Sequence, residues 1–89
     1  MIEWNEAKRR QNRDKHGVDF AGIDGFDWET AHVIPDERRD YGEARWIALG
    51  LIGVRVHVAT FTRRGDALRL ISLRKANLRE TRTWMETRI

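Results

Sequence analysis

Three segments with strand-like composition lie close together in the second half of the chain, and the short turns between them constrain the fold more than any other feature. They are Ala44–Leu51, Arg55–Thr62 and Ala67–Arg74, all rich in valine, isoleucine, leucine and threonine. Gly53 separates the first two, and Arg64-Gly65-Asp66 separates the second from the third. Connections this short join neighbouring antiparallel strands. The sequence therefore predicts an antiparallel meander.

The N-terminal third predicts helices. Asn5 can accept a backbone hydrogen bond as the N-cap of a helix over Glu6–His16, and Gly17 is the residue type that ends helices. In Phe20–Phe26 a large apolar side chain recurs at every third position, which is typical of one or two further helical turns. We expect both helices before the first strand of the sheet.

A fourth strand and a C-terminal helix complete the prediction. Thr30–Ile34 is a short strand candidate that Pro35 closes. Asn77 followed by Glu80 is close to a capping box and predicts the start of the last helix. One face of that helix would consist of Leu78, Thr81 and Met85. The expected fold is α+β: a small four-stranded antiparallel sheet, with N-terminal helices and a C-terminal helix, in which one sheet face stays partly open to a ligand.

Length and composition limit the possible classes. With 89 residues the chain predicts a single domain over residues 1–89. It has no cysteine, which excludes disulfides and thiolate metal sites, and its three histidines lack a metal-binding spacing, so we expect no metal and no other cofactor. The longest near-apolar run is far too short to span a bilayer, and charged residues occupy the place of a signal peptide. We expect a cytoplasmic protein without membrane contact.

Positive charge is concentrated in the C-terminal half. The net charge is +3, and Ala44–Ile89 holds ten lysines and arginines against three aspartates and glutamates. Such a bias attracts polyanions, and nucleic acid is the leading partner class. Basic solvated faces are also common on small domains that bind no nucleic acid.

The arginines inside the predicted strands limit the kinds of partner that the sheet can have. Arg45, Arg69 and Arg74 stand among apolar residues, where an unpaired charge is costly to bury. They need either internal carboxylates or an anionic ligand, and we expect phosphate at one or more of them. Strict alternation would place Arg74 on one face of its strand and Arg69 on the other, and it would make the valine side of Val54–Val58 part of the core.

The reaction that such a surface can support is limited. The chain has neither a cysteine nucleophile nor a glycine-rich phosphate loop. RNA supplies its own nucleophile, the 2′-hydroxyl, so that a ribonuclease needs only proton-transfer groups and cations around one phosphate. His16, His57, Glu43 and Glu80 are the candidates for proton transfer, although His16 also suits a helix end and Glu80 a helix cap.

Several strings, taken together, resemble the BrnT family of bacterial type II toxins. They are Glu3-Trp4-Asn5, Lys15-His16-Gly17-Val18-Asp19-Phe20, Gly42-Glu43-Ala44-Arg45 and Arg69-Leu70-Ile71-Ser72-Leu73-Arg74-Lys75-Ala76. The resemblance implies a RelE-like fold and a ribonuclease that inhibits translation. It also implies neutralisation by a BrnA-like antitoxin with a ribbon-helix-helix DNA-binding domain, through which the complex would bind operator DNA.

The resemblance and the chemistry together give the expected site. His57 lies outside the matching strings and is set aside. The expected catalytic residues are His16, Arg45 and Arg74, and the expected RNA-backbone contacts are Lys15, Arg69 and Lys75. The activity would be that of a metal-independent endoribonuclease. The alternative is a non-catalytic basic module that binds RNA or a protein.

Overall fold

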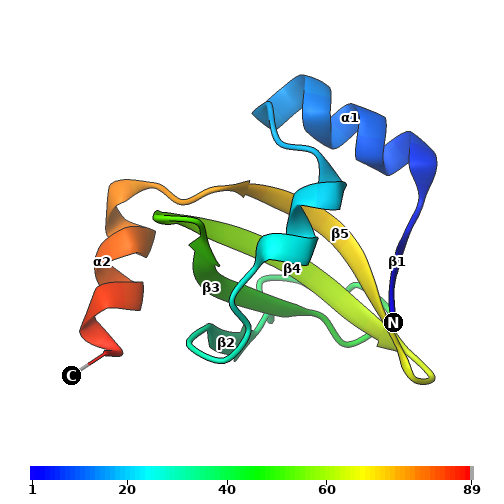
Figure 1. Ribbon diagram of the computed structural model, residues 1–89. Coiled ribbons are helices and arrows are strands. Elements are labelled where there is room, and N and C mark those ends of the chain that lie inside the picture. The colour runs from blue at the N-terminus through cyan, green and yellow to red at the C-terminus, as the bar shows by residue number, and fades with distance from the viewer. Residues whose placement is uncertain (89) are drawn as a thin grey trace.

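A computed structural model describes residues 1–88 of the chain and contains a five-stranded sheet with the strand order β1-β5-β4-β3-β2 (Figure 1). The α+β class is thereby confirmed. In chain order the elements are β1 (Ile2–Trp4), α1 (Glu6–His16), the 3-10 helix η1 (Phe20–Gly25), β2 (His32–Pro35), β3 (Trp46–Ile52), β4 (Arg55–Arg64), β5 (Ala67–Lys75) and α2 (Leu78–Glu86).

The predicted meander is confirmed, but the sheet is neither four-stranded nor wholly antiparallel. β2 to β5 pair in antiparallel order, whereas β1 pairs in parallel with β5, with Ile2 opposite Leu68 and Trp4 opposite Leu70. A strand of three residues is too short to show alternation in the sequence, and its partner lies far along the chain. The extra strand makes the sheet mixed.

The two turns of the meander contain glycine where the backbone requires it. Gly53 between β3 and β4 has φ of 63°, and Gly65 between β4 and β5 has φ of 59°. Each is the first residue of a two-residue turn, a position that needs positive φ in type II′ hairpins. These turns fix the register of the three longest strands.

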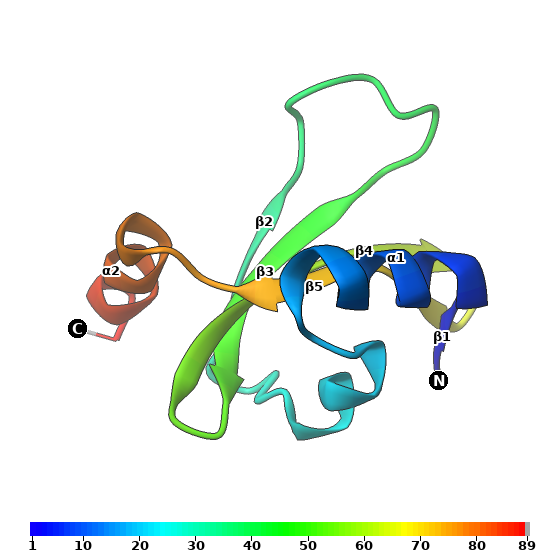
Figure 2. The same cartoon turned by 90° about the horizontal axis from the view of Figure 1, so that it is seen from above.

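Each face of the sheet carries a core cluster. One face, here called the η1 face, carries the larger core cluster, to which η1 contributes Phe20 and Ile23. The other, here called the α2 face, carries the smaller cluster of Leu49, Val56, Val58 and Ala76, against which Trp84 of α2 packs. In Figure 2, η1 lies on one side of the sheet and the segment between β2 and β3 projects on the other.

Val54 departs from the predicted valine core. It is fully exposed in the turn before β4, whereas Val56 and Val58 are buried. Because Val54 belongs to the turn, the buried alternation of β4 begins one valine later than the sequence pattern suggests.

A β-bulge in β5 rearranges the two sets of side chains that strict alternation predicts. Thr60 lies opposite Ser72 and Phe61 lies opposite Leu70, so Ile71 is an extra residue. Beyond the bulge Leu70 joins Leu73 in the core of the η1 face. The predicted separation of Arg69 from Arg74 is therefore wrong, because the bulge brings both to the α2 face.

Helix α2 begins as predicted but presents a different face to the sheet. Asn77 and Glu80 form the capping box. Leu78 is 66% exposed and Met85 is 57% exposed, whereas Trp84 packs on the sheet and donates its indole N–H to the carbonyl of Thr30. One aromatic ring thus replaces the apolar stripe that we expected to pack. None of the helices in residues 1–88 is long and apolar enough to cross a membrane.

Candidate functional site

Part of one edge of β5 is open, and α1 is attached there. β1 pairs only with residues 68–70 of β5, so within residues 1–88 the backbone beyond the bulge has no strand on this side. The buried side chain of Asn12 takes the place of a strand: it accepts a hydrogen bond from the Leu73 amide at 3.2 Å and donates to the Leu73 carbonyl at 2.6 Å. Its amide also donates to Val18 at 3.1 Å. This contact sets the position of the last turn of α1.

A hollow of about 280 Å³ lies where α1 meets this edge, and we call it the edge hollow. It is lined by Lys8, Gln11, Asn12, Lys15, His16, Ile71 and Ser72. Partial burial lowers the pKa of His16 from its ordinary value of 6.5, and the positive charges of Lys15 and Arg74 lower it further. The imidazole is therefore neutral at pH 7 and able to accept a proton.

Arg74 lies at the same end of β5 and is paired with Glu80 of α2. Its two terminal nitrogens donate to the two carboxylate oxygens at 2.8 Å each. This hydrogen-bonded pair lowers the pKa of Glu80, against the opposing effect of burial, and raises that of Arg74. Of the two kinds of partner expected for the strand arginines, Arg74 therefore has the carboxylate. Glu80 uses only the end of the guanidinium, and the fork formed by Nε and Nη2 keeps donors for another anion.

Arg45 and Arg69 form a second basic group on the α2 face. Arg69 lies opposite Thr62 of β4, and the Thr62 hydroxyl donates to the carbonyl of Ala44 at 2.6 Å. Arg45 is the residue after Ala44 and therefore lies beside Thr62 and Arg69. It stands four residues before Leu49, which lies in the same cross-strand row as Arg74. Four residues of extended chain span roughly 13 Å.

Both arginines have carboxylates nearby, but at longer distances. Arg45 Nε is 3.6 Å from Glu43, and Arg69 Nη1 is 3.7 Å from Glu3. These distances exceed hydrogen-bond length. The Arg45 guanidinium stacks on the Tyr41 ring, 4.0 Å from its centroid, and its buried Nε has no hydrogen-bond partner within residues 1–88. The arginines are partly neutralised but retain donors.

The loop over residues 36–45 adds groups that the sequence analysis missed. Asp36, whose side chain is 1% exposed, accepts hydrogen bonds from Arg38 and from the Tyr41 hydroxyl. The bonds from Arg38 are the main reason that the pKa of Asp36 falls to about 2, although burial opposes them. The positive charge of Arg38 also contributes to the lowered pKa of Glu80, which places Arg38 near the Arg74 pair. In the sequence this segment is only a polar turn after a proline, and no local pattern marks Asp36 as buried.

The expected site residues are only partly brought together. His16 and Lys15 line the edge hollow, and the charge of Arg74 acts on His16. Lys75 is exposed and lies opposite His57, one position after Arg74 and hence on the other face of β5. Within residues 1–88 no group of three or more histidine, cysteine, aspartate or glutamate side chains could hold a metal ion.

The chain matches the model of a known protein family. The model of the family described as "Ribonuclease toxin, BrnT, of type II toxin-antitoxin system" matches residues 4–80 of the 89-residue chain. The match includes every element of the sheet except the first residues of β1, and it ends within α2 at Glu80. No curated protein matches the chain.

Proposed function

The chain belongs to the BrnT family of ribonuclease toxins of type II toxin-antitoxin systems, and we propose that it is a metal-independent endoribonuclease that inhibits translation. The observation that carries this proposal is the edge hollow, where a neutral imidazole stands among positive charges. Such a site combines a base with cations for one phosphate, which is all that cleavage by a 2′-hydroxyl requires. A toxin that acts on translation must reach ribosomes, so we propose that the protein acts in the cytoplasm.

In the proposed mechanism His16 is the general base. It accepts the proton of a ribose 2′-hydroxyl, whose oxygen attacks the adjacent phosphorus. The bond from phosphorus to the 5′ oxygen breaks, that oxygen takes a proton from water, and a 2′,3′-cyclic phosphate remains. The unused fork of Arg74 stabilises the charge that grows on the phosphate oxygens. Glu80 holds the guanidinium in place for this contact.

The other cations hold neighbouring phosphates of the same strand. Arg45 and Arg69 lie too far along the α2 face to share the phosphate of Arg74, and they contact the RNA backbone further on. Lys15 stands beside His16 at the edge hollow. Lys75 reaches the RNA around the open edge of β5, from the other face. An RNA strand that binds in this way crosses the edge instead of lying on one sheet face.

The partner is an antitoxin, as the toxin-antitoxin family implies. We propose a BrnA-like antitoxin with a ribbon-helix-helix domain, which would carry the complex to operator DNA. The same cationic surface would be covered in the complex, so antitoxin and RNA would compete for it. Simultaneous binding of both would place the antitoxin elsewhere.

The decisive experiment is cleavage of RNA by the purified chain in the presence of a chelator. We expect products that end in a 2′,3′-cyclic phosphate. Replacement of Arg74 with alanine should lower the rate about 10²- to 10³-fold, the usual effect of losing one donor to a developing oxyanion. Arg10→Ala is the matched control, because Arg10 is an exposed arginine of the same helix as His16 and does not line the edge hollow. Binding without cleavage would overturn the proposal in favour of a non-catalytic module.

A further inference from the structure

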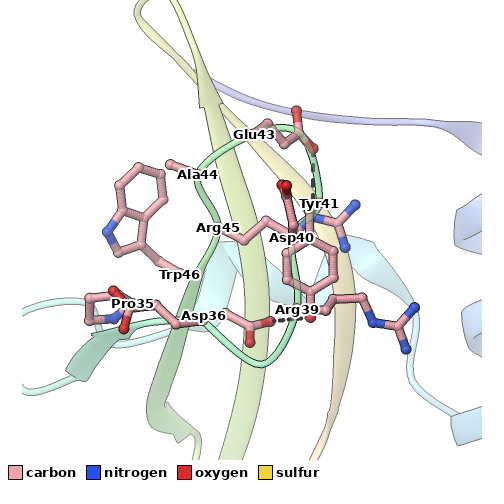
Figure 3. Close-up of a pocket in the computed structure, with 10 residues that line it drawn as sticks. Pro35, Asp36, Arg39, Asp40, Tyr41, Glu43, Ala44, Arg45 and Trp46 are labelled. Carbon is pink, nitrogen blue, oxygen red and sulfur yellow. Dashed lines mark hydrogen bonds and ion pairs between the residues drawn. The ribbon is translucent and has the colours of Figure 1, made fainter.

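A second and larger hollow lies between the ends of β2 and β3, and the proposed mechanism leaves it unused. It has a volume of about 570 Å³, within the range of small-ligand pockets, and we call it the loop hollow. Its apolar lining includes Pro35, Tyr41 and Trp46. Figure 3 shows Trp46 and Pro35 on one side of it, and Tyr41 with Asp40 on the other. Tyr41 and Trp46 are the aromatic residues of this lining.

The walls of the loop hollow are fixed by hydrogen bonds and stacking. The Tyr41 hydroxyl donates to buried Asp36 at 3.1 Å, and Arg45 stacks on the Tyr41 ring. Asp40 Oδ1 accepts a hydrogen bond from the Gly42 amide at 2.9 Å, which holds that carboxylate at the rim. A ligand would meet a preformed site, so that little ordering would oppose its binding.

The position of the hollow connects it to RNA. Arg45 both lines the hollow and lies on the α2 face in the row of Arg69. An RNA backbone held by these arginines passes beside the hollow. Bases of single-stranded RNA are commonly recognised by stacking on aromatic side chains and by hydrogen bonds to their edges. A flat base is the part of RNA that suits the aromatic side chain of Tyr41.

The rim of the hollow selects among bases, because it carries carboxylates. Asp40 and Glu37 have no ion-pair partner within residues 1–88, and ionised carboxylates only accept hydrogen bonds. Guanine presents two neighbouring donors, N1–H and the 2-amino group, which match the two oxygens of one carboxylate. Uracil presents a carbonyl oxygen on each side of its single N–H, and the carboxylate repels both.

We propose that the loop hollow binds a guanine base of the RNA, with Asp40 accepting hydrogen bonds from its Watson–Crick edge while Tyr41 contacts its ring. This inference deepens the proposed function, since it takes RNA as the ligand. It makes the loop over residues 36–45 the specificity element and leaves the chemistry to the edge hollow.

The test uses RNA that cannot be cleaved. Uridine oligonucleotides with 2′-O-methyl riboses, carrying one central guanosine, inosine or uridine, are titrated with the full chain by fluorescence anisotropy. Inosine lacks only the 2-amino group of guanosine. We expect the guanosine oligonucleotide to bind about tenfold more tightly than either of the others, as is usual for a good base contact.

Two variants assign the effect to Asp40. In Asp40→Asn the side-chain oxygen can still accept the hydrogen bond from the Gly42 backbone amide, but an NH₂ group replaces the second carboxylate oxygen. This variant should reduce the guanosine preference to about twofold. Asp66→Asn makes the same change in charge in the exposed turn between β4 and β5 and should keep the preference. A wild-type chain that binds all three oligonucleotides equally, or a preference that survives in Asp40→Asn, would refute the inference.

The readout separates this inference from the proposed function. Guanosine preference in a chain that does not cleave ordinary RNA would refute the nuclease and keep the loop hollow. Cleavage of ordinary RNA by a chain that shows no guanosine preference would do the opposite.

Discussion

The ion pair between Arg74 and Glu80 should stabilise the fold measurably, and its removal tests how far the arginine is already engaged before RNA binds. The two bonds of 2.8 Å are of the bidentate kind. The side chains are 31% and 24% exposed, so water screens the pair only in part. Glu80 also accepts a bond from the Asn77 amide in the capping box. Glu80→Ala therefore removes two separate contributions.

The expected magnitude follows from this geometry. Exposed ion pairs contribute about 0.2–1 kcal/mol, and hydrogen bonds to charged groups contribute about 1.5–3 kcal/mol. For a partly exposed bidentate pair we expect a coupling of about 1 kcal/mol. The lost hydrogen bond from the Asn77 amide adds about 1 kcal/mol. Glu80→Ala should thus lower the free energy of unfolding by about 2 kcal/mol and the Tm by about 10 °C for a chain of this size.

A double-mutant cycle isolates the pair. Urea unfolding, followed by circular dichroism at pH 7, is measured for Arg74→Ala, Glu80→Ala and the double variant; the bond from the Asn77 amide to Glu80 cancels in the cycle, because both variants at position 80 lack it. A coupling energy of zero within error would refute the reasoning and leave Arg74 free for phosphate.

The pair should also respond to pH in a defined direction. The pKa of Glu80 in the folded chain lies below its ordinary value of 4.5, so the folded state releases this proton more readily than the unfolded state. The stabilisation is fully present above pH 4.5 and is lost as the pH falls through the lowered pKa. In Glu80→Ala this part of the acid dependence should be absent.

Three further outcomes are expected. In the wild type the acid limb of the pH–rate profile should have its midpoint below pH 6.5, because the pKa of His16 is lowered, and His16→Ala should remove that limb; an unchanged limb would exclude His16 as the base. Asn12→Ala leaves the Leu73 amide and carbonyl without partners and should cost about 2–4 kcal/mol in urea unfolding, whereas a loss below about 1 kcal/mol would mean that water replaces Asn12. A Cβ at Gly50 would lie 2.6 Å from the ring of Phe26, so Gly50→Ala should lower the free energy of unfolding by about 1–3 kcal/mol, and a neutral effect would show that the ring moves freely.

The parts of the fold that the sequence predicts are those with local causes. Asn5 and Asn77 cap their helices through their own side chains, and Gly53 and Gly65 permit the turns that their backbone needs. Strand β1 has no such signal, since its three residues form a strand only because β5 offers them an edge. Helix α2 shows the same limit, because Trp84 rather than the predicted apolar stripe meets the sheet.

In the candidate site, too, features with local causes could be predicted and those that depend on distant residues could not. His16 and Lys15 are neighbours in the sequence, and their approach to Ser72 depends on the packing of α1 against β5, which includes the two hydrogen bonds of Asn12 to Leu73. The face on which Arg69 lies depends on the bulge, which has no counterpart in composition or spacing. The sequence therefore names the basic residues but not their arrangement.

The carboxylates beside the arginines explain how so many cations remain on one sheet before any RNA arrives. An unpaired guanidinium among apolar side chains would be costly, and each nearby acid reduces that cost. A phosphate must then share or displace these acids. Glu3 and Glu43 stand 3.7 and 3.6 Å from their arginines without hydrogen bonds, whereas Glu80 holds Arg74 by two. Arg69 and Arg45 can therefore turn to a phosphate at little cost and suit the capture of RNA. Arg74, held in one orientation with one fork unused, suits the site where geometry matters most, next to the phosphate that reacts.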